Sequence, residues 1–276
     1  MIARGWRKIV TRALEMDIGR GDLTSEVLVD DAQSGLAVLW ARQELVACGL
    51  PLMAEVFAQV DGRIVLEPVC AEGHMVHAGE AICRVAGPAR GILTGERVAL
   101  NFFQNLSAIA TVTHRYVARV AGTGARVVDT RKTTPGLGSM QKYAVRIGGG
   151  HNHRLGLDDG ILVKENHLAW AGGITAAVAR LRARVGHLHR IEVECETLAQ
   201  VEEALAVGVE VILLDNMDLA GLRAAVALAG GRAILEASGN VTLETIRAVA
   251  ETGVDLISVG ALTHSAGSVD VSLRVA

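Results

Sequence analysis

Short apolar runs that alternate with helical stretches dominate the chain from residue 126 onward. Six of these runs are rich in Val, Ile and Leu: RVVDT (126–130), GILVK (160–164), RIEVE (190–194), EVILLD (210–215), RAILEAS (232–238) and DLISVG (255–260). Continuous apolar strands separated by helices are typical of a parallel sheet that is covered by helices. The repetition predicts a closed or nearly closed α/β barrel, and a doubly wound open sheet is the structural alternative.

The first hundred residues have a different pattern, which is typical of an α+β domain. Residues 4–16 have helical spacing, and a second helix is expected at 51–59. Strand-like runs occupy 35–40 and 64–69, and glycine turns interrupt the β-like stretch 72–87. The N-terminal part is therefore predicted to be an α+β sandwich rather than a continuation of the barrel.

A long amphipathic helix is expected between the two regions, from about 95 to 120, with Thr94 as its N-cap. We expect this helix to join two domains. The first domain is predicted over residues 1–108 and the α/β barrel over 109–265. The C-terminal tail, 266–276, is expected to pack with the first domain.

The composition narrows the class of protein without identifying a ligand. Half of the 276 residues are hydrophobic and 21% are charged, which is enough to bury a large core. The net charge of −3 argues against a general attraction to nucleic acid or to an anionic membrane. Four scattered cysteines and the absence of an apolar run of about 18 residues lead us to expect a soluble, cytoplasmic protein.

Polar residues or glycines stand at or just after the end of each predicted strand. These are Asp129, Lys164, Glu194, Asp215, Ser238 and Gly260. In parallel α/β folds the carboxyl ends of the strands carry the functional site, because the loops that follow the strands converge there. The six strand ends therefore predict one shared site at the mouth of the barrel.

The segment 129–167 concentrates basic side chains at this mouth: Arg131, Lys132, His153, Arg154 and Lys164. Arginine forks bind carboxylate or phosphate oxygens in pairs, and lysine acts as a point charge. The segment predicts a polyanionic small-molecule ligand, with Gly148–Gly150 expected to let the backbone approach it closely. For His151, His153 and His167 we expect hydrogen bonding rather than metal ligation.

Glu194 and Asp215 end consecutive strands, so we expect them to share a divalent cation such as Mg²⁺ or to bind ribose hydroxyls. The EASGN segment (236–240) follows a strand and is expected to open a helix, whose N-terminus would bind phosphate. The SVGALTHS segment (258–265) offers a second turn of this kind.

These motifs together resemble the quinolinate phosphoribosyltransferase family. The resemblance covers nearly the whole chain, through DIGRGDLTS, GERVALNFFQNLSAIAT, DTRKTTPGL, KYAVRIGGGHNHR, ILVKENH, IEVECETL, ILLDNM, LEASGN and TGVDLISVGALTHS. It implies an N-terminal α/β sandwich joined to an incomplete α/β barrel. It also implies that the protein is a pentosyltransferase and that it forms a homodimer with shared active sites. That enzyme converts quinolinate and phosphoribosyl pyrophosphate to nicotinate mononucleotide, pyrophosphate and CO₂ with Mg²⁺.

The resemblance also implies roles for the basic residues. Arg131, His153 and Arg154 match residues that hold the quinolinate carboxylates. Arg97 matches an arginine that the partner subunit contributes across the dimer interface. Many family members read TTPGLR, whereas this chain has Gly138 in place of that arginine.

Catalytic groups and phosphate-binding turns are implied in the same way. Lys132 and Lys164 match lysines close to the substrates and phosphates. Glu194 and Asp215 match acids associated with the ribose and Mg²⁺. The phosphate-binding turns correspond to Ser238, Gly239, Gly260 and His264.

Four alternatives to this reaction remain open on sequence. A nicotinate phosphoribosyltransferase would need fewer cations around the ring, and a paralogue associated with molybdenum transport is a further relative. A Schiff-base aldolase would use Lys164 as its nucleophile. A ligand sensor would bind quinolinate without releasing CO₂.

Overall fold

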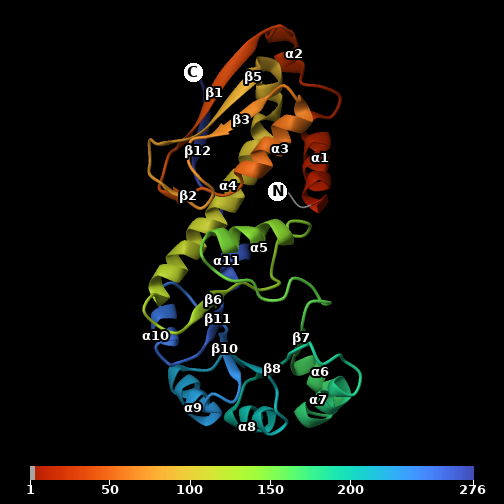
Figure 1. Ribbon diagram of the computed structural model, residues 1–276, viewed down its shortest axis with the longest axis vertical. Coiled ribbons are helices and arrows are strands. Elements are labelled where there is room, and N and C mark those ends of the chain that lie inside the picture. The colour runs from red at the N-terminus through yellow and green to blue at the C-terminus, as the bar shows by residue number, and fades with distance from the viewer. Residues whose placement is uncertain (1–3) are drawn as a thin grey trace. The chain divides into compact units, whose positions relative to one another are not determined.

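The computed structural model describes residues 4–276, which its contacts divide into two compact units (Figure 1). Unit 1 contains the chain up to His114 together with Thr134–Gly149 and Ser265–Ala276. Unit 2 contains Arg115–Thr133 and Gly150–His264. The prediction placed the tail 266–276 with the first domain but left residues 134–149 in the barrel, whereas these residues belong to unit 1.

Unit 1 is built on a four-stranded antiparallel sheet in the order β12-β1-β5-β3. Its strands are β1 (Ser34–Ala41), β3 (Val65–Pro68), β5 (Ala81–Pro88) and β12 (Val271–Val275). The C-terminal strand β12 pairs with β1, so the chain ends in the unit in which it begins. A second small sheet joins β2 (Leu45–Val46) to β4 (Met75–Val76). The mixed α+β pattern predicted for the N-terminal region is therefore confirmed.

Helices complete unit 1: α1 (Arg4–Ile18), α2 (Leu23–Leu28), α3 (Leu50–Val60), α4 (Ala89–Val120) and α5 (Gly138–Ile147). Two of these, α1 and α3, confirm the predicted helices at 4–16 and 51–59. The polar segment 17–25 contains the start of α2. The Asp22 carboxylate accepts a hydrogen bond from the Ser25 N–H and caps that helix.

The long helix α4 begins earlier than predicted, and Thr94 is not its N-cap. Strand β5 runs directly into the helix, and the Ala89 N–H donates to the carbonyl of Gln33. The chain beside β5 thus supplies the acceptor for an N–H group at the start of the helix, which a capping side chain would otherwise provide. Thr94 lies inside the helix and donates to the Arg90 carbonyl one turn earlier. From Arg115 onward α4 belongs to unit 2, so it connects the two units.

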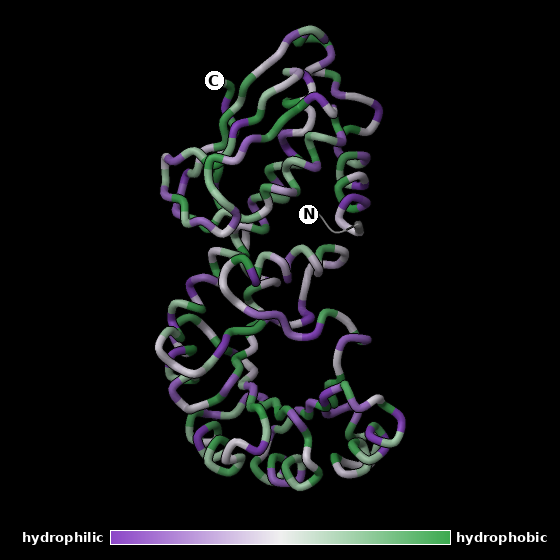
Figure 2. Tube along the Cα trace, in the orientation of Figure 1, coloured by the Kyte–Doolittle hydropathy of each residue, from purple (hydrophilic) through white to green (hydrophobic). Residues whose placement is uncertain are grey.

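Unit 2 contains one six-stranded parallel sheet in the order β6-β11-β10-β9-β8-β7. Its strands fall on the six predicted runs: β6 (Arg126–Val128), β7 (Ile161–Val163), β8 (Ile191–Cys195), β9 (Val211–Asp215), β10 (Ile234–Ser238) and β11 (Leu256–Ser258). Apolar residues predominate along these strands (Figure 2). Val193, Ile212 and Leu214 are fully buried at the centre of the sheet.

The helices of unit 2 identify the sheet as an incomplete barrel rather than a doubly wound sheet. They are α6 (Glu165–Ala171), α7 (Ile174–Arg182), α8 (Leu198–Ala206), α9 (Leu219–Ala229), α10 (Ile246–Ala250) and α11 (Ala261–His264). From α6 to α10 each helix touches the next, so these helices cover one face of the sheet. From β7 to β11 each strand lies beside the strand that precedes it in the chain, and β11 lies beside β6. The strand order therefore lacks the reversal that a doubly wound fold has.

The barrel stays open between its edge strands β6 and β7, for which the described residues show no mutual pairing. Beside β6 lies a single residue, His151, which forms a parallel bridge with Val128. Within residues 4–276, no helix is both long and apolar enough to cross a membrane.

Gly148 has a packing role rather than the predicted role of admitting a ligand. It ends α5 against α4, where an added Cβ would overlap the Ala110 carbonyl oxygen and lie 2.7 Å from the Cβ of Thr113. It does not line the pocket described below. The residue is glycine because two helix backbones meet there.

We expect Gly148→Ala to lower the free energy of unfolding by about 1–3 kcal/mol, since overpacking forces the helices apart. Thermal and denaturant unfolding of the purified variant would measure this. Gly62→Ala is the matched control, because an added Cβ at Gly62 meets nothing within 4 Å. Equal stability of the two variants would contradict the proposed packing role.

Candidate active site

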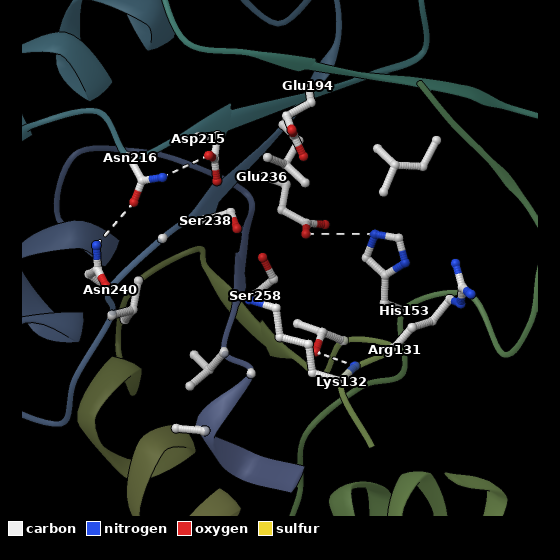
Figure 3. A pocket seen from close by; sticks show the side chains of 18 of the residues that line it. Arg131, Lys132, His153, Glu194, Asp215, Asn216, Glu236, Ser238, Asn240 and Ser258 are labelled. Carbon is white, nitrogen blue, oxygen red and sulfur yellow. Dashed lines mark hydrogen bonds and ion pairs between the residues drawn. The ribbon is translucent and has the colours of Figure 1, made fainter. Parts of the chain in front are cut away.

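A pocket of about 840 Å³ lies at the carboxyl ends of the strands in unit 2 (Figure 3). Every strand or the loop after it contributes lining residues, as the sequence predicts. The pocket brings together all the predicted site residues of unit 2: Arg131, Lys132, His153, Arg154, Lys164, Glu194, Asp215, Ser238, Gly239, Gly260 and His264. Arg97 is the exception, because it lies on α4 in unit 1 and is exposed.

Two arginines give one part of the pocket its positive charge. Burial lowers the pKa of Arg154, and the nearby positive charge of Arg131 lowers it further. The Arg154 Nη1 donates to the Gly160 carbonyl at 2.9 Å, which orients the guanidinium. Two mutually repelling cations at a pocket wall indicate a binding site for an anion with more than one charge.

Asp129 positions these groups without lining the pocket itself. It follows β6, is fully buried, and was predicted only as one of the six strand ends. Its carboxylate accepts hydrogen bonds from the Asn152 side-chain amide at 2.5 Å and from the His153 N–H at 2.9 Å. The segment that carries His153 and Arg154 is thereby held beside β6.

Two glutamates that the sequence did not single out, Glu192 and Glu236, face His153. The His153 Nε2 lies 3.1 Å from Glu192 Oε2 and 3.7 Å from Glu236 Oε1. Burial and the neighbouring Glu192 charge raise the pKa of Glu236 to about 7. His153 therefore has two carboxylate neighbours, which come from strands far away in the sequence.

A period of two along each strand is the signal that finds these glutamates. Glu192 precedes Glu194 by two residues, and Glu236 precedes Ser238 by two. Side chains two apart on a strand point to the same face of the sheet. Both glutamates therefore point toward the interior of the barrel, one layer below the strand ends.

The acidic part of the pocket combines Glu194 and Asp215 on adjacent strands β8 and β9. Glu194 forms an ion pair with the Lys164 ammonium group. Asp215 accepts from the Asn216 side-chain amide at 2.7 Å, and Asn216 lines the pocket in a left-handed backbone conformation (φ 53°). Asn216 is a further residue that sequence reasoning missed.

The two predicted phosphate-binding turns lie in the pocket, but the first does not open a helix. After Ser238 the chain forms an irregular loop, and α10 begins only at Ile246. Gly239 has φ +99°, and an added Cβ would lie 2.6 Å from the Cγ of Asn216, so only glycine fits. Gly260 precedes the short helix α11, and an added Cβ there would lie 3.2 Å from the Lys132 side chain.

His167 also has a hydrogen-bonding role in the structure, since its Nδ1 accepts from the Lys164 N–H at 2.9 Å. His151 uses its backbone to bridge β6. Among the described residues, the one group of metal-type donors with three members is His153, Glu192 and Glu236.

The fold and this pocket define an α/β-barrel enzyme that binds anionic substrates. Comparison with known proteins identifies the family. Residues 22–107 match the N-terminal domain of quinolinate phosphoribosyl transferase, and residues 109–274 match its C-terminal domain. The chain belongs to the quinolinate phosphoribosyltransferase family.

Individual relatives agree with this assignment along the whole chain. A probable nicotinate-nucleotide pyrophosphorylase [carboxylating] of Bacillus subtilis is 43% identical, over 98% of this chain and 93% of that protein. The solved nicotinate-nucleotide pyrophosphorylase of Francisella tularensis is 39% identical, with a TM-score of 0.96 over 100% of this chain and 98% of the other. Human nicotinic acid phosphoribosyltransferase is 13% identical with a TM-score of 0.59, which shows a shared fold alone.

We expect Glu236→Gln to change how stability depends on pH. The folded protein keeps the Glu236 proton up to about pH 7, whereas the unfolded chain releases it near pH 4.3. The stability of the wild type should therefore decrease as the pH rises through this range, and the stability of the amide variant should not. At pH 8 the variant should be more stable by about 3–4 kcal/mol, and near pH 4 the two should be similar.

Denaturant unfolding across this pH range would measure the difference. Glu196→Gln changes an exposed glutamate of the same unit and should follow the wild type. A Glu236→Gln variant that parallels the wild type at every pH would show that Glu236 is ionised in the folded protein.

Proposed function

We propose that this chain transfers the phosphoribosyl group of phosphoribosyl pyrophosphate to quinolinate with decarboxylation. The products are nicotinate mononucleotide, pyrophosphate and CO₂, as a step in the de novo synthesis of NAD. The observation that supports this most strongly is a single pocket, in a member of this family, with paired arginines and paired acids. The arginines suit a pyridine diacid, and the acids suit a ribose.

Quinolinate is a dianion, so its recognition requires more than one fixed cation. Arg131 and Arg154 line the same pocket, and each guanidinium can bind a carboxylate through two N–H groups. His153 remains a predicted third contact, with its Nε2 turned toward Glu192. Nicotinate has one carboxylate fewer, so this density of cations favours the diacid as substrate.

Phosphoribosyl transfer requires stabilisation of two opposite charges. Departure of pyrophosphate leaves positive charge on the ribose and negative charge on the leaving group. Glu194 and Asp215 would face the ribose, and Lys132 and Lys164 would face the phosphates. The turns at Ser238, Gly239, Gly260 and His264 would hold the 5′-phosphate through backbone N–H groups.

Mg²⁺ is the metal that this reaction class implies, and the donors present fit it. Glu194 and Asp215 are hard oxygen ligands on neighbouring strands, and Mg²⁺ typically combines one or two carboxylates with waters and substrate phosphates. Glu194 shares one oxygen with Lys164, which leaves its second oxygen for the metal. When bound, Mg²⁺ would neutralise the charge of the pyrophosphate.

Decarboxylation needs no separate cofactor, because ribosylation makes the ring nitrogen positively charged. Loss of the 2-carboxylate leaves a carbanion at C2, beside that nitrogen, and the ring charge stabilises it. The Lys164 environment does not favour the aldolase alternative. Its ammonium group is paired with Glu194, whereas a Schiff-base nucleophile needs a free amine.

We expect quinolinate, but not nicotinate, to be consumed with phosphoribosyl pyrophosphate and Mg²⁺, with release of CO₂. Arg131→Ala should lower kcat/KM for quinolinate by about 100-fold, since hydrogen bonds to a charged group contribute about 1.5–3 kcal/mol. A coupled pyrophosphate assay and trapping of labelled CO₂ would measure both results.

Arg180→Ala serves as the control for Arg131→Ala, because Arg180 is exposed on α7, away from the pocket. It should keep wild-type kinetics. Near-normal kcat/KM in Arg131→Ala would contradict the assignment of the diacid site. Binding of quinolinate without turnover by the wild-type chain would support a sensor instead.

We also propose a homodimer in which Arg97 of one subunit completes the site of the other. The support is its exposed position on α4, outside the pocket-bearing unit. Arg97→Ala and Arg154→Ala should each be inactive alone. A heterodimer of the two would have one intact site, so an equal mixture should regain about a quarter of the wild-type activity.

Activity after subunit exchange, with heterodimers confirmed by mass, would measure this recovery. No recovery would mean that each subunit uses its own Arg97, and an Arg97→Ala variant that is active alone would mean that the site uses no Arg97. A cytoplasmic location remains a prediction, supported by the four free cysteines (Cys48, Cys70, Cys83 and Cys195).

A further inference from the structure

The floor of the pocket holds an acidic group that has no role in substrate binding or in phosphoribosyl transfer. Glu236 lines the pocket from β10, and its side chain is only 2% exposed. Glu192 and His153 are its neighbours, and the three donor atoms lie within 4.8 Å of one another. Figure 3 shows the Glu236 carboxyl group pointing toward the His153 ring. Two buried carboxylates at the floor of a dianion site require a positive charge or a proton.

His153 cannot supply that charge to both acids. Its Nδ1 accepts a hydrogen bond from the Arg154 N–H at 2.7 Å, so Nδ1 carries no hydrogen. The one ring hydrogen is then on Nε2, where it points at the closer acid, Glu192. The Glu236 Oε1 lies 3.7 Å from the His153 Nε2, which is beyond hydrogen-bond distance. This oxygen has no hydrogen-bond partner.

The other groups that face Glu236 support a protonated acid. Glu192 on β8 and Asp129 after β6 are negative, and together with burial they raise the pKa of Glu236. His153 and the Ser258 hydroxyl on β11 act in the opposite direction but less strongly than burial and Glu192. A neutral Glu236 also removes a repulsion that would otherwise oppose a dianionic ligand.

The reaction needs a proton at the point where it loses CO₂. The bond from C2 to the carboxylate breaks, CO₂ leaves, and the electron pair stays on C2. A proton must then bind to C2, because otherwise the carbanion can recapture CO₂. Arginine side chains do not release protons in proteins, Lys164 is paired with Glu194, and Lys132 is assigned to the phosphates.

We propose that Glu236, held as a carboxylic acid beside Glu192 and His153, donates the proton that replaces the departing CO₂ at C2 of the pyridine ring. The Glu236 O–H bond breaks, the C2–H bond forms, and solvent then returns a proton to the carboxylate. A general acid is most effective when its pKa is near the working pH. This inference rests on the proposed function.

The test separates the two chemical steps in Glu236→Gln. Single-turnover experiments would follow pyrophosphate release and CO₂ release from labelled quinolinate. We expect CO₂ release to slow by about 100-fold, the usual range for loss of a general acid, and far more than pyrophosphate release slows. A mononucleotide that still carries both carboxylates should accumulate and be visible by mass.

Two further variants distinguish acid chemistry from structural support. Glu236→Asp retains an acid and should recover part of the CO₂ release. Glu192→Gln keeps the cluster filled but removes a negative charge that raises the pKa of Glu236, so CO₂ release in this variant should decline at a lower pH than in the wild type. In the wild type, CO₂ release should decline as the pH rises through about 7, and Glu236→Gln should lose this dependence.

Several outcomes would overturn the proposal. Equal slowing of both steps in Glu236→Gln would indicate a structural role, and unchanged CO₂ release would identify another donor. Stoichiometric binding of Zn²⁺ to the wild type, lost in Glu236→Gln, would make the cluster a metal site instead. If the wild type releases no pyrophosphate from quinolinate, the proposed function itself fails.

Discussion

The buried carboxylate of Asp129 is the contact on which the pocket depends. It holds the segment after Gly150 against β6 by accepting hydrogen bonds from Asn152 and from the His153 N–H. This segment has almost no strand pairing of its own beyond the single bridge at His151. Without that attachment His153 and the adjacent Arg154 would sit on a loose loop at the open edge of the barrel. The negative charge of Asp129 also helps to raise the pKa of Glu236.

The distribution of charge within the pocket follows from the geometry of the barrel. Loops after the strands bring cations to the rim, and alternate residues of the strands place acids in the interior. The ion pair between Lys164 and Glu194 lies at the strand ends, one layer above Glu192 and Glu236. An anionic substrate therefore meets positive charge at the rim, while Glu236 below can remain neutral because burial opposes its ionisation. Binding of the diacid and a supply of protons are compatible in one small volume.

The strands and most of the rim could be predicted because each depends on local sequence. Apolar runs locate the six strands, and the residue after each run reaches the mouth in any parallel barrel. The errors involve contacts between distant segments. Thr94 is not a cap because β5 feeds directly into α4, and Gly148 serves helix packing because Ala110 lies against it. Glu192 and Glu236 were not predicted, because they lie two residues before the strand ends on which the prediction was based.

By itself the sequence determined the class of fold, the order of its elements, the family, and which cations and acids gather at the barrel mouth. These properties follow from periodicity and from motifs of a few residues. Only the tertiary structure decided that residues 134–149 belong to unit 1 and that Glu192, Glu236 and His153 share one buried space. The protonation of Glu236 depends on that space, because desolvation and repulsion act through distances that no local pattern encodes.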